Sequence, residues 1–165
     1  MTLDLTIESL IVFVAVLCVL LFYSTVDIRR REVPNQYMVL GAVVAILIAI
    51  FTGTLYFTPV LAVVSIVFAV GVSLVLFRVG AFGGADAKAL IIIGIASPGV
   101  QLGVWSDPFI EGIVGIGGQV MIALTLGYVY SRLRGLEQTP NVEAILPLIP
   151  FLTLGYALIQ LLAFL

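Results

Sequence analysis

The chain has 165 residues, of which 62% are hydrophobic and only 10% are charged, and its formal net charge is −2. This apolar content, with a mean hydropathy of +1.30, exceeds that of ordinary soluble domains and predicts a protein that crosses a membrane several times. The sequence contains no histidine, which excludes Ser-His and Cys-His catalysis and the commonest zinc sites. The single cysteine, Cys18, excludes a disulfide within the chain and a cysteine-rich zinc module.

Six apolar runs are long enough to be membrane spans, each of which takes about 20 helical residues. In chain order they are Ile7–Val26, Tyr37–Phe57, Pro59–Phe77, Ala89–Trp105, Pro108–Tyr130 and Ala144–Leu165. They use most of the chain. The sequence therefore predicts an all-α integral membrane protein, a bundle of six transmembrane helices that forms one domain over residues 1–165. The first run is interpreted as a retained helix, because Asp4 and Glu8 stand where a signal peptide would carry Lys or Arg.

The basic residues predict the orientation of the bundle. All seven lie beside the first, third and fifth connections between the apolar runs: Arg29, Arg30, Arg31, Arg78, Lys88, Arg132 and Arg134. Because basic connections stay in the cytoplasm, these three connections are predicted to be cytoplasmic and both termini to lie outside. Two prolines, Pro147 and Pro150, fall inside the sixth run and are expected to kink its helix.

Most of the nine acidic residues have an ordinary interpretation as solvated helix ends or loop charges. These are Asp4, Glu8, Glu32, Asp107, Glu111, Glu137 and Glu143. Asp27 and Asp86 remain, and each alone also has a structural explanation. Asp27 ends the first run, where it could pair with an arginine three or four residues on. Asp86 follows two glycines and could cap the next helix, with its carboxylate accepting backbone N–H groups.

Considered together, Asp27 and Asp86 indicate acid–base catalysis by a pair of carboxylates. They lie on the same predicted side of the membrane. Ionisable groups at membrane depth are costly and tend to mark function. If folding brings the two aspartates within reach of one water molecule, the pair keeps one proton near neutral pH. The ionised group can activate a water that attacks a peptide carbonyl, while the protonated group donates to the carbonyl oxygen. This mechanism needs no metal and no cofactor, and the sequence leaves open which aspartate is acid and which is base.

Two motifs resemble the signatures of the type IV prepilin peptidases, membrane aspartic proteases that include the archaeal preflagellin (prearchaellin) peptidases. The first is DIRRREVPN, residues 27–35, in which an aspartate precedes a basic stretch, a hydrophobic residue and Pro34-Asn35. The second is GGADAK, residues 83–88, which is similar to the family's Gly-x-Gly-Asp-x-Lys pattern, with Ala85 in place of the second glycine. The segment PLIPFLTLG, residues 147–155, is similar to the family's proline-bearing last helix.

The resemblance implies an endopeptidase that removes a short basic leader from pilin-like or archaellin precursors, just ahead of their hydrophobic helix. It implies Asp27 and Asp86 as the catalytic pair, without cofactor, metal or nucleic acid, at the cytoplasmic face of a multi-pass protein of the plasma membrane. The supporting motif residues are Pro34, Asn35, Gly83, Gly84 and Lys88. Larger bacterial relatives carry a cysteine-bearing segment and methylate the new N-terminus. This chain lacks that segment, so the resemblance implies a peptidase without methyltransferase activity.

Two other functions stay open at this point. An ion- or proton-coupled transporter could use Asp27 and Asp86 as relay groups, although it needs acids toward both faces, whereas these two lie on one. A non-catalytic component of a pilus or archaellum assembly machine could keep the aspartates as helix caps. Cleavage of a precursor separates the peptidase from both alternatives.

Overall fold

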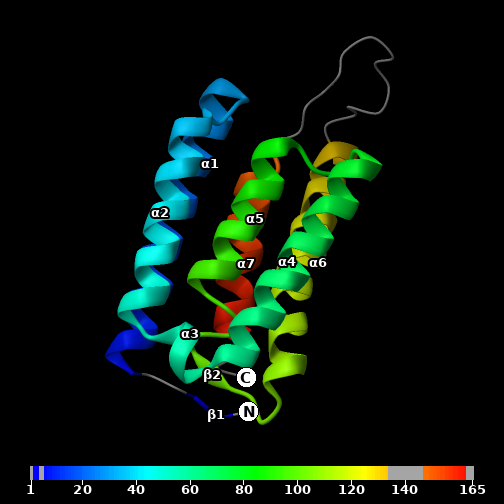
Figure 1. Ribbon diagram of the computed structural model, residues 1–165. Helices are drawn as coiled ribbons and strands as arrows, with labels where there is room; N and C mark the ends of the chain where they lie inside the picture. The colour runs from blue at the N-terminus through cyan, green and yellow to red at the C-terminus, as the bar shows by residue number, and fades with distance from the viewer. Residues whose placement is uncertain (1, 4–5, 134–146, 163–165) are drawn as a thin grey trace.

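The computed structural model describes residues 2–3, 6–133 and 147–162. Its helices are α1 (Ile7–Arg30), α2 (Asn35–Phe51), α3 (Thr54–Phe57), α4 (Pro59–Val79), α5 (Gly84–Ala96), α6 (Pro108–Leu133) and α7 (Ile149–Leu162). Six of them run side by side, and the short α3 joins α2 to α4 at one end (Figure 1). The two-residue strands β1 (Thr2–Leu3) and β2 (Gly103–Val104) pair antiparallel at that same end.

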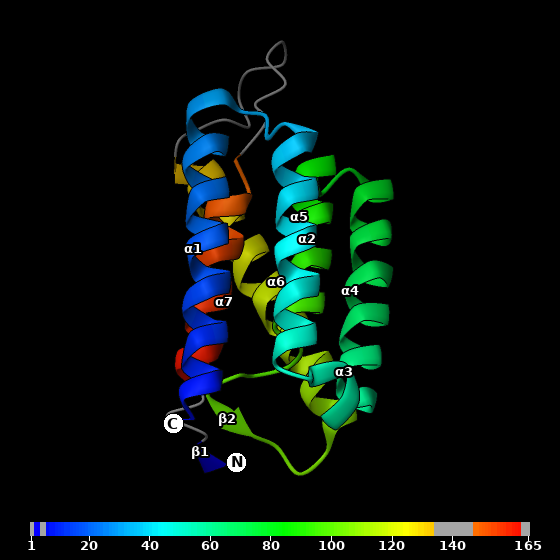
Figure 2. The ribbon, with the colours of Figure 1, turned by 60° about the vertical axis from the view of Figure 1, so that its left-hand side comes forward.

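The shorter helices α5 and α7 each pack against two longer helices, and α4 packs against α6. α7 packs against α1 and α6, while α5 packs against α2 and α4 (Figure 2). Among the largest fully buried side chains are Tyr23, Leu90, Ile93 and Tyr156. Large apolar side chains also cover the outer faces of α1, α2 and α4. Such exposed apolar faces are expected of helices that lie in lipid.

Three helices, α1, α4 and α6, are long and apolar enough to cross a membrane, with 24, 21 and 26 residues. The helices α2, α5 and α7 have 17, 13 and 14 residues. At about 1.5 Å per residue, α5 covers about 20 Å of a hydrocarbon core that is about 30 Å thick. The predicted helical membrane protein is therefore supported, whereas the six-span bundle stays a prediction.

Three of the predicted spans differ from the observed helices. The fourth, 89–105, is wrong because the helix begins at Gly84 and ends at Ala96, before Ser97 and Pro98. The second, 37–57, is interrupted after Phe51 by a turn in which Gly53 has a φ of 63°. In the sixth, 144–165, the described helix begins only at Ile149, and the two ends of that span lie outside the described residues.

The prolines of the last helix mark its start. Pro147 precedes α7 and Pro150 is its second residue. The first helical turn tolerates proline, because its backbone N–H groups have no partner within the helix. The expected kink is therefore wrong, since neither proline lies in the helix interior.

Glu111 was expected to be a solvated helix end, and that expectation is also wrong. The side chain is only 7% exposed, and its Oε1 accepts a hydrogen bond of 3.1 Å from the backbone N–H of Val100. Nearby, Gln160 of α7 accepts a 2.7 Å hydrogen bond from the backbone N–H of Gln101. Two backbone N–H groups of the non-helical segment after α5 thus find acceptors on α6 and α7. Asp107 does behave as an exposed cap, accepting from the N–H of Phe109 at 2.8 Å.

Replacing Glu111 with alanine is expected to lower the free energy of unfolding by about 1–3 kcal/mol, because the N–H of Val100 would stay buried without an acceptor. Glu111→Gln keeps an oxygen at the same position and should cost less. Thermal unfolding in detergent micelles measures both variants. Equal losses for the two substitutions would contradict this role of the carboxylate oxygen.

Gly155 allows α7 to approach α6 closely. A Cβ at this position would lie 2.5 Å from the backbone oxygen of Gln119, and a backbone atom cannot move aside as a side-chain tip can. Gly155→Ala is therefore expected to destabilise the protein by about 1–3 kcal/mol, the usual cost of overpacking. Gly71→Ala is the matched control, because nothing lies within 4 Å of a Cβ there. Thermal unfolding should separate the two variants, and an unchanged melting temperature for Gly155→Ala would contradict the close approach.

Candidate active site

The first motif forms the corner between α1 and α2. α1 ends at Arg30, and Arg31 adopts a left-handed conformation with a φ of 55°. Its N–H donates to the backbone oxygen of Asp27 at 2.8 Å, which closes the last turn. Pro34 then caps α2, which starts at Asn35. Pro34 and Asn35 thus set the entry of the second helix and hold the corner beside Asp27.

The second motif begins α5 at the same end of the bundle (Figure 1). Asp86 is the third residue of this helix, and its Oδ2 accepts a 2.8 Å hydrogen bond from the backbone N–H of Gly83. The capping role that the sequence suggested for Asp86 is therefore confirmed. It engages one carboxylate oxygen, which leaves the other for a second partner.

Asp27 belongs to α1, but its side chain is hydrogen-bonded to the start of α7. Its carboxylate accepts a hydrogen bond from the backbone N–H of Ile149, at the start of α7, rather than pairing with the arginines that follow it. A helix N-terminus favours a negative charge. The other oxygen, Oδ2, is buried and has no hydrogen-bond partner in the described structure. Sequence analysis missed Ile149, although two prolines bracketing it are typical of a helix start.

Both aspartates line one cavity of about 470 Å³. All seven predicted site residues line it, together with four neighbours from the two motifs: Asp27, Arg31, Glu32, Val33, Pro34, Asn35, Gly83, Gly84, Ala85, Asp86 and Lys88. The side chains of Asp27 and Asp86 are 7% and 8% exposed. Folding thus brings the two motifs together around a pair of largely buried carboxylates.

The environment of Asp86 changes its proton affinity. Burial raises the pKa of this carboxyl to about 7, the nearby Asp27 adds to the rise, and the hydrogen bond from Gly83 opposes it. Near neutral pH Asp86 therefore exists partly as the protonated acid, which can donate a hydrogen bond. Asp27, with an unpaired buried oxygen, offers an acceptor beside it. The pair can hold a water molecule or a carbonyl group between a donor and an acceptor.

Lys88 joins the two motifs at the mouth of the cavity. Its Nζ donates a 2.5 Å hydrogen bond to Oδ1 of Asn35. The interaction is exposed, and it links the first turn of α2 to the first turns of α5. In the structure Lys88 tethers the side chain of Asn35.

A metal centre would need at least three suitable ligands. Within residues 2–3, 6–133 and 147–162, no three His, Cys, Asp or Glu side chains are grouped in this way. The cavity itself holds three acidic side chains, of which Glu32 is exposed. The absence of a metal stays a prediction that a chelator can test.

The comparisons with known proteins agree with the two motifs. The family model described as the type IV leader peptidase family matches residues 14–133, nearly three quarters of the chain. The matched range includes both aspartates, whereas α7 lies beyond it. No curated protein and no solved structure matches the chain. The chain belongs to the type IV leader peptidase family, and it is therefore a protease.

Proposed function

We propose that this protease is an aspartic endopeptidase that removes the short basic leader from type IV pilin-like or archaellin precursors. Asp27 and Asp86 form its catalytic pair. The observation that carries the proposal is the shared cavity, in which two largely buried carboxylates from separate motifs face one space. Each is held through one oxygen by a backbone N–H at a helix start, so that its other oxygen is available for water or substrate.

The environments of the two aspartates support a division of roles. Asp86 carries the proton near neutral pH, because burial favours its neutral form, and donates it to the oxygen of the scissile carbonyl. Asp27, whose carboxylate accepts a hydrogen bond from the N–H of Ile149, takes a proton from the attacking water. The water oxygen bonds to the carbonyl carbon. When the C–N bond breaks, the proton held by Asp27 passes to the leaving nitrogen, and Asp86 recovers its own from the collapsing intermediate.

We also propose that the active site faces the cytoplasm of a multi-pass protein of the plasma membrane. Six basic residues of the described chain lie at the end of the bundle that holds the aspartates: Arg29, Arg30, Arg31, Arg78, Lys88 and Arg132. Such a charge bias favours the cytoplasmic side. The starts of α1, α4 and α6 are then at the outer face, with both termini outside. A substrate helix in the same bilayer presents its leader junction to this end.

Co-expression with a precursor that carries a basic leader and a hydrophobic helix tests the proposal. The precursor should be shortened on a gel, with a new N-terminus at the leader junction. A metal chelator should leave the cleavage unchanged, because the proposed chemistry uses only carboxylates and water. A precursor that stays full-length would reject the leader-peptidase proposal in favour of a transporter or an assembly component. Strong inhibition by the chelator would instead reject the two-aspartate mechanism.

A further inference from the structure

An apolar groove adjoins the catalytic cavity. This α2/α5 groove has a volume of about 280 Å³. Its lining residues are Asn35, Met38, Val39, Ala42, Lys88, Ile91, Ile92 and Ile95. Asn35 and Lys88, which are hydrogen-bonded to one another, line both the groove and the catalytic cavity. The two spaces therefore meet at this pair of side chains.

The lining residues form one stripe on each of two neighbouring helices. On α2 they are residues 35, 38, 39 and 42, and on α5 they are residues 88, 91, 92 and 95, the spacing of a single helical face. Both helices begin at the active end and run side by side, in direct contact (Figures 1 and 2). At about 1.5 Å per residue, each stripe covers about two helical turns. The groove thus extends from the end of the bundle that holds the aspartates toward the middle of the bundle.

We propose that the α2/α5 groove binds the first two helical turns of the precursor's hydrophobic segment, immediately after the scissile bond. This inference rests on the proposed function. The occupant follows from the distribution of charge along the continuous path. The cavity is lined by charged side chains of both signs, among them Arg31, Glu32 and Lys88, which suit the polar junction ahead of the scissile bond. The groove contains only apolar side chains beyond Asn35 and Lys88 at its mouth, which suit an uncharged helix.

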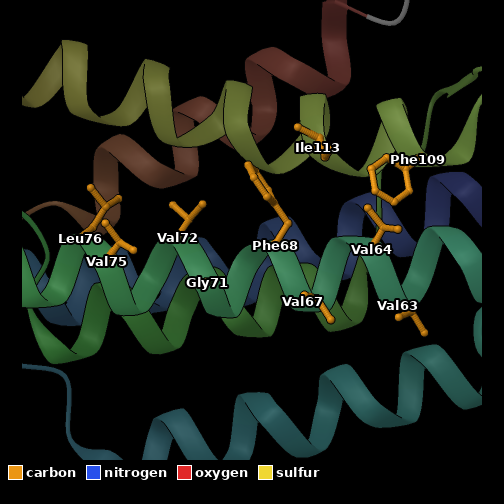
Figure 3. Close-up of a pocket in the computed structure, with 10 residues that line it drawn as sticks. All are labelled: Val63, Val64, Val67, Phe68, Gly71, Val72, Val75, Leu76, Phe109 and Ile113. Atoms are coloured by element: carbon orange, nitrogen blue, oxygen red, sulfur yellow. The ribbon is translucent and has the colours of Figure 1, made fainter.

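A larger apolar groove between α4 and α6 can be compared with the α2/α5 groove. This α4/α6 groove has a volume of about 640 Å³, and Figure 3 shows the side chains of α4 that line it together with Phe109 and Ile113 of α6. It is as apolar as the α2/α5 groove, but it shares no lining residue with the catalytic cavity. Among the described residues, no side chain therefore lines both this groove and the catalytic cavity, as Asn35 and Lys88 do for the α2/α5 groove. Continuity, rather than size, therefore identifies the substrate groove.

Two positions give a matched pair of variants. Val39 lines the α2/α5 groove and is 64% exposed, and Val67 lines the α4/α6 groove and is 65% exposed. Val39→Trp should obstruct the first groove, while Val67→Trp obstructs the second. Cleavage of a precursor with its full hydrophobic segment is measured with purified protein in lipid-detergent micelles. Val39→Trp should raise KM about tenfold, the effect of losing one buried apolar side chain, with little change in kcat. Val67→Trp should match the unmodified protein.

Disulfide cross-linking gives a second measurement that does not depend on turnover. Cys18 is replaced by serine, and Val39→Cys or Val67→Cys is introduced together with Asp86→Asn, so that the bound precursor stays intact. Precursors with one cysteine at successive positions after the scissile bond should cross-link to position 39 with a spacing of three to four residues, and not to position 67. Preferential cross-linking to position 67, or an unchanged KM in Val39→Trp, would overturn the groove assignment. If the unmodified protein cleaves, such a result rejects the groove alone. If it does not cleave, the proposed function fails and the groove assignment fails with it.

Discussion

Replacing either aspartate of the pair with asparagine is expected to reduce leader cleavage by about 10³-fold or more. General acid–base catalysis by one side chain typically contributes 10²–10⁴-fold, and groups that act as a unit lose most of their effect when one is removed. Asparagine keeps the shape of aspartate, and its amide oxygen can accept the hydrogen bonds from Ile149 or Gly83. Asp27→Asn and Asp86→Asn should therefore leave the fold intact. Rates of product formation from purified protein measure the loss.

The control for this pair is Asp107→Asn. Asp107 is an exposed cap at the start of α6, at the opposite end of the bundle. Because aspartate and asparagine are nearly equivalent caps, this variant should retain full activity. The double variant of Asp27 and Asp86 should be no slower than either single variant. Substantial cleavage by either single variant would contradict the two-aspartate mechanism while leaving the family membership unaffected.

The sequence alone was enough to predict that the two motifs lie at the same end of the bundle, because that prediction needs only local patterns. The positions of basic residues oriented the apolar runs, and the two motifs then fell at one end. The seven residues chosen from these motifs all line one cavity. Such signals are carried by residues close together in the chain, and they survive errors in the exact ends of helices.

What the sequence could not reveal are contacts between distant segments. The donor to Asp27 is the backbone N–H of Ile149, more than a hundred residues further on. The neighbouring prolines indicate a helix start, but not which carboxylate that helix start meets. Glu111 is buried because Val100 needs an acceptor after α5 has ended. Hydropathy treats a glutamate near a helix end as solvated, and it treats residues 97–105 as a continuation of the apolar run. Both errors arise because hydropathy averages composition and does not record which polar groups are paired.

The stability of the protein is expected to fall as the pH rises from about 4 to about 7, because of Asp86. Burial raises the pKa of this carboxyl from 3.8 to about 7 in the folded state. Between these values the folded protein holds a proton that the unfolded chain has released, so raising the pH favours unfolding. Above pH 7 both states have lost the proton, and the cost of burying the charge is fully present.

Asp86→Asn should remove this pH dependence. Each pKa unit corresponds to about 1.4 kcal/mol, so between pH 5 and pH 8 the variant should gain about 2–3 kcal/mol relative to the unmodified protein. It should be more stable at pH 8 and nearly equal near pH 4, because the neutral acid and the amide are similar in polarity and size. Denaturant unfolding in micelles at several pH values measures the difference. Asp107→Asn is the control, and its free energy of unfolding should keep the pH dependence of the unmodified protein.

The expected gain in stability has a functional meaning, because it accompanies the loss of activity predicted for the same substitution. A carboxylate that only capped α5 would be better replaced by an amide, which accepts the hydrogen bond from Gly83 without carrying a charge. An acid that costs stability at neutral pH is expected where its proton is used in catalysis. If Asp86→Asn proved less stable than the unmodified protein at pH 8, Asp86 would be stabilising the fold in its charged form. The case for a shared proton would then fail.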